Sequence, residues 1–225
     1  MKTVHFLFFT TALFLTFRAE AQLEVGVQMS YGSSWQEYGD DFTPDQNNFK
    51  IKGFRGAISL FYPMNSWMSI GVEPAFTRRG AACVPGFVWV NPIPIEDASI
   101  NGNYVELPLL AKFDYPIWKD QLFAVARVGA SAAYMLNGFI EFQPFNPEDP
   151  TQRTDIDFEV TPEIRRWDFG LHTGLGLGYQ LGGGMLSFDV RYYHGLKDVS
   201  SILTSRNRAI TYGLGYSIPL NSLWE

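Results

Sequence analysis

The stretch from residue 166 to residue 195 constrains the fold most, because two runs of alternating residue types flank a triple-glycine turn at 182–184. In the first run, large apolar side chains such as Leu171 alternate with polar or glycine positions that include Asp168 and His172. A period of two predicts β-strands, and the glycine turn joins them into a hairpin. One face is apolar and the other is polar or bare, which is typical of a barrel with a lipid-facing outside and a polar inside.

The same pattern recurs along the rest of the chain. Charged residues make up only 18% of the sequence and aromatic residues 16%, which favours an all-β protein. Eight strands are predicted, at about residues 23–31, 54–61, 67–79, 103–114, 121–136, 167–179, 186–193 and 207–218. Three connections are short and four are long and polar, as expected when all short turns lie at one end. The predicted fold is an eight-stranded antiparallel up-and-down transmembrane β-barrel.

Two prolines interrupt the predicted strands. Pro74 and Pro108 each lack the N–H that a ladder hydrogen bond needs, so neither is expected inside a central strand. A β-bulge at each proline is one way to accommodate them.

The N-terminus has the features of a secretory signal. Lys2 precedes an apolar run, and Ala19-Glu20-Ala21 is a small-x-small cleavage motif. We therefore expect a cleaved signal peptide at 1–21, a barrel domain at 22–225, and export to the outer membrane. The alternative, a membrane anchor helix, is disfavoured because the apolar run is shorter than the ~20 residues that a span needs. The penultimate Trp224 departs from the aromatic final residue that is usual for such barrels.

The face opposite the apolar residues collects charge. Four acidic side chains, four fixed basic side chains and one histidine are predicted to point inward as an ion-pair network: Arg55, Glu73, Glu106, Lys112, Arg127, Asp168, His172, Asp189 and Arg191. Ions inside a closed barrel must be paired, and an eight-stranded barrel has little room beyond its own side chains. The pattern therefore predicts a filled interior rather than an open pore.

The same face also offers candidates for catalytic or metal-binding residues. His172 together with Asp168 and Asp189 suggests a catalytic or metal cluster, with Asp189 reaching the histidine across the hairpin. No Ser-His-Asp arrangement is legible, so membership of the ion-pair network is favoured. Asp149, Asp155, Asp157 and Glu159 are calcium candidates, but their spacing matches no EF-hand. We expect no catalytic, cofactor or metal site.

Charge also limits the partners. The formal net charge of −6 argues against nucleic acid. Near the outer rim, Arg78-Arg79 ends one predicted strand and Arg165-Arg166 opens another. Their guanidinium groups could pair with lipopolysaccharide phosphates there; ordinary strand-end charge is the alternative. The expected partners are outer-membrane lipid and lipopolysaccharide, with an unidentified envelope or secretion protein, and a monomer is expected.

Three segments resemble one known family. The segment Tyr104-Val105-Glu106-Leu107-Pro108-Leu109-Leu110-Ala111-Lys112, the glycine-rich run from 168 to 178 and the run DVRYYHGLKD from 189 to 198 are similar to the PorT-like outer-membrane β-barrel family. The resemblance spans essentially the whole chain after the signal segment. It implies an eight-stranded membrane barrel, presents Pro108 as a family feature, and suggests a link to secretion or adhesion machinery without an assigned activity.

Three functions remain open from the sequence. The favoured one is a non-enzymatic integral outer-membrane protein with long outer loops and a plugged polar interior. The alternatives are a soluble lipocalin-like binding barrel, which needs an apolar interior, and an outer-membrane lipid-modifying enzyme, which needs a nucleophile and a base near the outer leaflet.

Overall fold

The computed structural model describes residues 23–39, 50–83, 95–144, 151–159, 161, 163–201 and 204–220. These residues form ten strands: β1 (Glu24–Tyr38), β2 (Ile51–Pro63), β3 (Met68–Val72), β4 (Ala75–Cys83), β5 (Ile95–Trp118), β6 (Leu122–Pro144), β7 (Gln152–Asp155), β8 (Trp167–Leu181), β9 (Gly184–Asp198) and β10 (Ser205–Pro219). The predicted signal segment and Trp224 lie outside the described residues. Among the described residues there is no helix with the length and apolar character to cross a bilayer.

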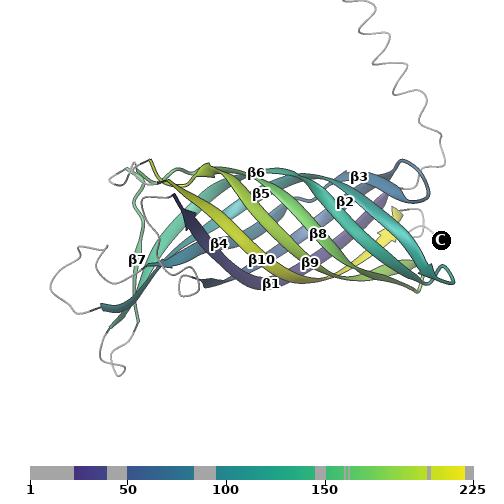
Figure 1. Ribbon diagram of the computed structural model, residues 1–225, viewed down its shortest axis with the longest axis horizontal. Helices are drawn as coiled ribbons and strands as arrows, with labels where there is room; N and C mark the ends of the chain where they lie inside the picture. The colour runs from purple at the N-terminus through teal and green to yellow at the C-terminus, as the bar shows by residue number, and fades with distance from the viewer. Residues whose placement is uncertain are drawn as a thin grey trace, which may run out of the picture.

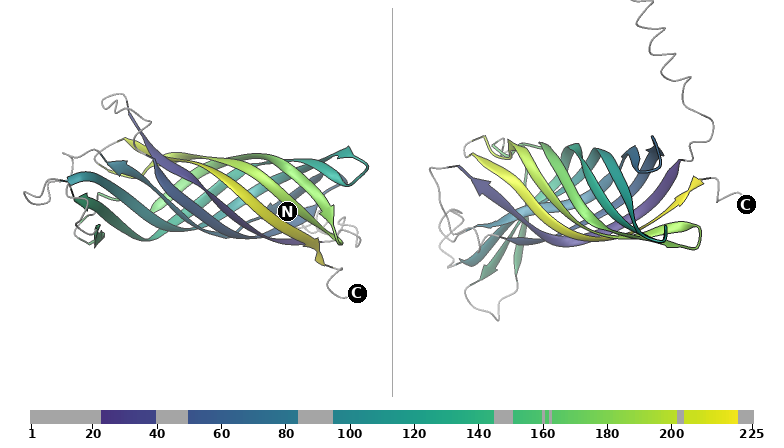
Figure 2. Two further views of the ribbon diagram at one scale, coloured as in Figure 1. Left: turned by 90° about the horizontal axis from the view of Figure 1, so that it is seen from below. Right: turned by 45° about the vertical axis from the view of Figure 1, so that its right-hand side comes forward.

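The strands close into a barrel (Figure 1). Neighbours along the chain pair antiparallel, and β1 pairs with β10 from Glu24–Pro219 to Tyr38–Ser205, which completes the ring. β3 and β4 both pair with β2 and with β5, so together they make one barrel strand, while β7 pairs only with β6. The strands are tilted against the long axis in both views of Figure 2. The predicted eight-stranded up-and-down barrel is confirmed.

The ends of the barrel differ. The start of β1, the end of β10 and the three short turns lie at the end shown on the right in Figure 1, which we call the short-turn end; the other is the long-loop end. At the β8–β9 turn, Gly182 and Gly183 have φ of 56° and 80°. Positive φ at both central residues is the requirement of the tight hairpin turn that matches strand twist, and glycine meets it without strain.

The prolines between β3 and β5 do not shift the register. Val72 pairs with Leu109 and Ala75 with Glu106, so the offset is the same on both sides of Pro74 and the expected bulges are absent. Glu73 donates its N–H to the Pro108 carbonyl at 3.2 Å. Pro108 has no N–H to return, and Arg55 Nη2 lies 3.5 Å from the Glu73 carbonyl instead. At this residue pair, the Arg55 side chain takes the place of the backbone donor that Pro108 lacks.

Several strands run further than predicted. β5 begins at Ile95 rather than near residue 103, and β6 continues to Pro144 rather than ending near residue 136. These extensions pair with each other, and β4 and β7 flank them, so a four-stranded sheet projects beyond the ring at the long-loop end (Figure 1). The sequence prediction ended where the apolar alternation ended, whereas backbone pairing continues through polar residues.

The two faces divide as the alternation predicts. On β8, Asp168 and His172 are buried, whereas Leu171 and Leu175 are exposed on the outside. On β1, Met29 is 77% exposed and Gln28 is 6% exposed. A continuous apolar exterior of this kind suits lipid rather than water.

Candidate functional site

The charged side chains inside the barrel are the candidate site. The nine residues proposed from the sequence all point into the barrel. His172 hydrogen-bonds Glu106. The other eight make ion pairs: Arg55, Glu73, Glu106, Lys112, Arg127, Asp168, Asp189 and Arg191. Sequence reasoning missed further members, among them Glu24, Gln28, Arg79 and Asp114. The cluster falls into three parts along the barrel axis.

The middle part is built on two carboxylates. Glu73 Oε1 lies 2.6 Å from Arg55 Nη1 and 2.5 Å from Arg191 Nη1. Asp189 Oδ2 contacts Arg191 Nε at 3.1 Å and also Arg127 Nη1. Gln28 Nε2 donates to both oxygens of Asp189, at 2.8 and 2.9 Å. Strands β1, β2, β6 and β9 and the β3–β4 junction are thereby tied together across the interior.

The part toward the long-loop end is built on Glu106 and Arg79. Arg79 Nη2 lies 2.6 Å from Glu106 Oε1, and its Nη1 lies 3.4 Å from Asp168 Oδ2. The guanidinium also stacks on the ring of Tyr193, with 3.8 Å between its Cζ and the ring centroid. Asn207 Nδ2 donates to Asp168 at 2.9 Å.

Arg79 corrects one sequence interpretation. The prediction placed Arg78-Arg79 at the rim, near lipopolysaccharide, yet Arg79 is 3% exposed and points into the barrel. The reason is that β4 continues to Cys83, so Arg79 keeps the inward parity of Ala75 and Thr77. Continuing that parity one step beyond Thr77, to the last residue of the predicted strand, would have identified Arg79.

The part toward the short-turn end is built on Lys112. Its Nζ lies 2.6 Å from Glu24 Oε2 and 3.1 Å from Asp114 Oδ2, and 5.2 Å from the centroid of the Phe61 ring. Lys112 is fully buried while the two carboxylates are partly exposed. Glu24 shares the inward parity of Gln28, and Asp114 that of Lys112, which is the signal that would have found them.

His172 does not form a catalytic triad. Its Nε2 lies 2.9 Å from Glu106 Oε1 and 3.0 Å from Ser131 Oγ, and Ser131 donates to the same Glu106 oxygen at 2.7 Å. A triad needs the serine on one ring nitrogen and the acid on the other, whereas here both meet Nε2. The suggested approach of Asp189 to His172 is wrong, because the register places Tyr193 opposite His172 and Gly176 opposite Asp189.

The acidic segment near β7 offers no assembled metal site. Asp155 Oδ1 contacts Arg153 Nη2 at 3.3 Å, and Asp157 Oδ1 accepts the N–H of Glu159 at 2.9 Å. Asp149 lies outside the described residues. Within the ranges that the structure describes, no group of three His, Cys, Asp or Glu side chains is placed to hold a metal ion.

Arg165 and Arg166 are engaged by the backbone. Arg166 donates to the carbonyls of Met135 and Leu136 at 3.2 and 3.3 Å, and its Cζ lies 4.6 Å from the ring of Tyr134. Arg165 Nη1 lies 3.5 Å from the carbonyl of Asp198. These contacts fix the segment that leads into β8.

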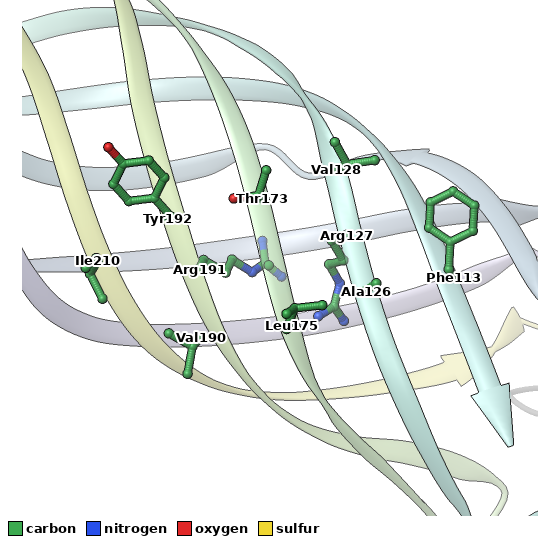
Figure 3. Close-up of a pocket in the computed structure, with 11 residues that line it drawn as sticks. Phe113, Ala126, Arg127, Val128, Thr173, Leu175, Val190, Arg191, Tyr192 and Ile210 are labelled. Atoms are coloured by element: carbon green, nitrogen blue, oxygen red, sulfur yellow. The ribbon is translucent and has the colours of Figure 1, made fainter. Parts of the chain in front are cut away.

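One depression of ≈530 Å³ lies on the outside of the wall between β5 and β10. Figure 3 shows Arg127 and Arg191 side by side at this place, with Leu175 and Val190 nearby. The depression is lined mainly by outward apolar side chains, namely Phe113, Ala126, Val128, Leu175, Val190, Tyr192 and Ile210. It faces the lipid, and its lining also includes Gly174 and two arginines of the interior network, Arg127 and Arg191.

Comparison with solved structures returns small outer-membrane barrels at low identity. The Yersinia pestis attachment invasion locus protein Ail, crystallised with a heparin analogue, is 17% identical over 88% of this chain and 99% of its own, with a TM-score of 0.42. Neisserial surface protein A is 14% identical over 85% and 95%, with a TM-score of 0.42. The N-terminal barrel of Pseudomonas aeruginosa OprF is 12% identical over 88% and 100%, with a TM-score of 0.36.

A comparison with curated protein sequences found no match. A family model described as an outer membrane protein beta-barrel domain matches residues 16–201, most of the chain. The match ends before β10, the strand that closes the ring onto β1. The sequence match and the closed barrel with its apolar exterior agree, and this chain belongs to the outer membrane protein β-barrel domain family, whose place is the outer membrane.

Proposed function

We propose that this protein is a non-enzymatic outer-membrane anchor, in which an ion-paired, plugged barrel holds the projecting sheet of β4–β7 toward a partner outside the cell. The observation that carries the proposal is the network of buried ion pairs that crosses the barrel from wall to wall. It leaves the long-loop end as the part that is free to interact.

The interior supports a plug. In the middle part and the part toward the long-loop end, four arginines face four carboxylates. The arginines are Arg55, Arg79, Arg127 and Arg191, and the carboxylates are Glu73, Glu106, Asp168 and Asp189. One interior space, bordered by Glu24, Gln28 and Arg127, measures ≈10 Å³, enough for about one water molecule. Solute passage would require several of these ion pairs to separate at once.

The projecting sheet supports an interaction role. Residues of β7 are exposed along its whole length, and its outer edge is unpaired among the described strands. The guanidinium of Arg153 stacks on Phe139, with 3.7 Å from Cζ to the ring centroid, and Phe139 is completely buried. A stacked, hydrogen-bonded sheet presents its surface with less entropy to lose on binding than a free loop.

The two alternatives fit less well. A lipocalin-like barrel needs an apolar interior, whereas the interior here holds buried ion pairs and the exterior is apolar. A lipid-modifying enzyme needs a base at the outer leaflet with a serine beside it. The one Ser–His contact described, Ser131–His172, is buried inside the barrel.

Other features of the proposal rest on the sequence. We infer a cleaved signal at 1–21, short turns on the periplasmic side, a monomer, no nucleic-acid partner, and PorT-like kinship with its link to secretion or adhesion machinery. The residues that carry the kinship are those of the Tyr104–Lys112 segment and the run from 168 to 178.

The plug is tested by conductance. Purified protein reconstituted in planar bilayers is expected to give no steady channels. Arg191→Ala together with Glu73→Ala, which removes two side chains from the middle part, is expected to open a small conductance. Thr211→Ala, outside the network, is the matched control. Steady ion channels from the unaltered protein would exclude the plug.

The partner role is tested by crosslinking in intact cells. A photo-reactive amino acid at Thr154, which is exposed on β7, is expected to capture a discrete envelope or surface protein. The same group at Lys119, on a short turn, is the control. Equal products from both positions, or none from Thr154, would count against β7 as the contact surface.

A further inference from the structure

A row of outward side chains crosses five strands near the long-loop end. Tyr31 pairs with Phe54, Arg78 Cζ lies 5.7 Å from the centroid of the Phe54 ring, and Arg78 pairs with Asn103, which pairs with Asn137. Tyr31 and Phe54 are exposed at 56% and 40%. The row changes from aromatic to polar side chains, as expected where lipid tails give way to headgroups.

The outward face of β2 also indicates how deep Lys52 and Arg78 lie relative to the apolar band of the barrel. Toward the long-loop end it carries Ile58, then Phe54, then Lys52, all exposed. An apolar, an aromatic and a cationic residue follow one another in that order. Lys52 and Arg78 therefore lie just above the apolar band of the barrel, where the phosphates of outer-leaflet lipids are found.

Lys52 and Arg78 are neighbours on this face. The β2–β4 pairing runs from Ala57–Ala75 to Arg55–Thr77. The same offset, continued along both strands, sets Lys52 near Gly80 and makes Lys52 and Arg78 diagonal neighbours, with Cα atoms on the order of 7 Å apart. The strands are in contact here, because a Cβ on Gly53 would lie 2.8 Å from the Arg78 carbonyl. Adjacent like charges repel unless an anion lies between them.

No carboxylate of the described residues neutralises this pair, since neither Lys52 nor Arg78 has an ion-pair partner there. The cations inside the barrel differ, because each of them meets a carboxylate. Arg78 is nevertheless positioned: its Nε donates to Asn103 Oδ1 at 3.3 Å, and its Cζ lies 5.0 Å from the Phe139 ring. With Nε held in this way, its two terminal nitrogens are left for another acceptor.

We propose that Lys52 and Arg78 bind a phosphate group of an outer-leaflet glycolipid such as lipopolysaccharide. A guanidinium fork matches two phosphate oxygens, and an ammonium group supplies a further charge-assisted donor. The Asn103–Asn137 amide pair, joined at 2.7 Å, borders Arg78 and offers polar contacts to the sugar. The proposal rests on the outer-membrane location and on the long loops facing outward.

The test measures lipid binding to the full chain in detergent. Bisphosphorylated lipid A, the same lipid after removal of both phosphates, and inorganic phosphate are titrated separately against the protein by native mass spectrometry. The double variant Lys52→Gln with Arg78→Gln is compared with Lys119→Gln, a cation 5.3 Å from the Trp118 ring at the opposite end of the barrel. Heat-dependent gel migration verifies that each variant is folded.

The expected result is a loss of affinity for lipid A of about tenfold or more in the double variant, and less than about twofold in Lys119→Gln. The dephosphorylated lipid should bind both proteins equally and weakly. Unchanged affinity in a folded double variant, or equal binding of the two lipids, would overturn the site. Inorganic phosphate binding as tightly as lipid A would overturn the glycolipid as its source.

Discussion

Glu106 Oε1 and Arg79 Nη2 lie 2.6 Å apart inside the barrel. Ser131 Oγ and His172 Nε2 contact the same oxygen. Arg79 comes from β4 and Glu106 from β5, so the pair joins neighbouring strands through the interior as well as through the backbone ladder. The carboxylate is completely buried. Its removal leaves the buried Arg79 with only the longer 3.4 Å ion pair to Asp168.

The first prediction concerns that carboxylate. Glu106→Ala takes from Arg79 the shorter of its two ion pairs and lowers the free energy of unfolding by about 3–5 kcal/mol, the usual result of breaking one side of a buried pair. Urea unfolding in lipid vesicles, followed by tryptophan fluorescence, measures it. Asp155→Ala is the control, since its pair with Arg153 is exposed and is expected to contribute about 0–1 kcal/mol. Similar losses in both variants would contradict the buried network.

The second prediction concerns the space under Tyr193. A Cβ on Gly170 would lie 2.4 Å from atoms of the Tyr193 ring, which itself stacks on Arg79. Gly170→Ala must displace that ring and is expected to destabilise the barrel by about 1–3 kcal/mol. A Cβ on Gly56 would meet nothing within 4 Å, so Gly56→Ala should be neutral within about 0.5 kcal/mol. The same urea titration compares the two, and equal stability would argue against the packing.

The third prediction separates the lipid face by depth. Leu175 is 71% exposed near the middle of β8, and Leu181 is 50% exposed at its end. Leu175→Arg is expected to cost about 2–4 kcal/mol in a bilayer, whereas Leu181→Arg should cost about 0–1 kcal/mol. Unfolding in vesicles measures both values. A larger loss at Leu181 would mean that the apolar band is centred elsewhere.

The fourth prediction concerns Pro108. Because the register is continuous there, Pro108→Ala is expected to supply the missing ladder bond to the Glu73 carbonyl. The new amide at residue 108 should then be protected from hydrogen exchange, as observed by NMR in micelles. Rapid exchange at that amide, with the neighbouring residues protected, would show that the strands do not adopt this pairing.

The side-chain parity of the strands was readable from the sequence, and their pairing partners were not. Alternation alone identified which face of each strand carries Asp168, Asp189 or Arg191. It stopped at the end of the apolar pattern, which is why Arg79 was assigned to the rim although it shares the parity of Glu73.

Contacts across the barrel need the register of several strands at once. Gln28 and Asp189, for example, are 161 residues apart and meet only through the combined offsets of β1, β10 and β9. Alternation shows which face a residue lies on but not how far one strand is shifted against the next. It therefore could not show that the neighbour of His172 is Glu106 and not Asp189. The suggestion of bulges at Pro74 and Pro108 is wrong for a related reason. The sequence shows that a backbone donor is missing but not whether a side chain replaces it.

The seam between β1 and β10 has a consequence for biogenesis. The first strand to leave the export channel is the one that pairs with the last, so Glu24–Tyr38 must wait for Ser205–Pro219 before its outer edge is satisfied. Until then an open edge would meet lipid, where unpaired backbone groups are very unfavourable. A nascent chain stopped anywhere before β10 therefore cannot rest in the bilayer as a partial barrel, and delivery of the complete chain is a condition for insertion.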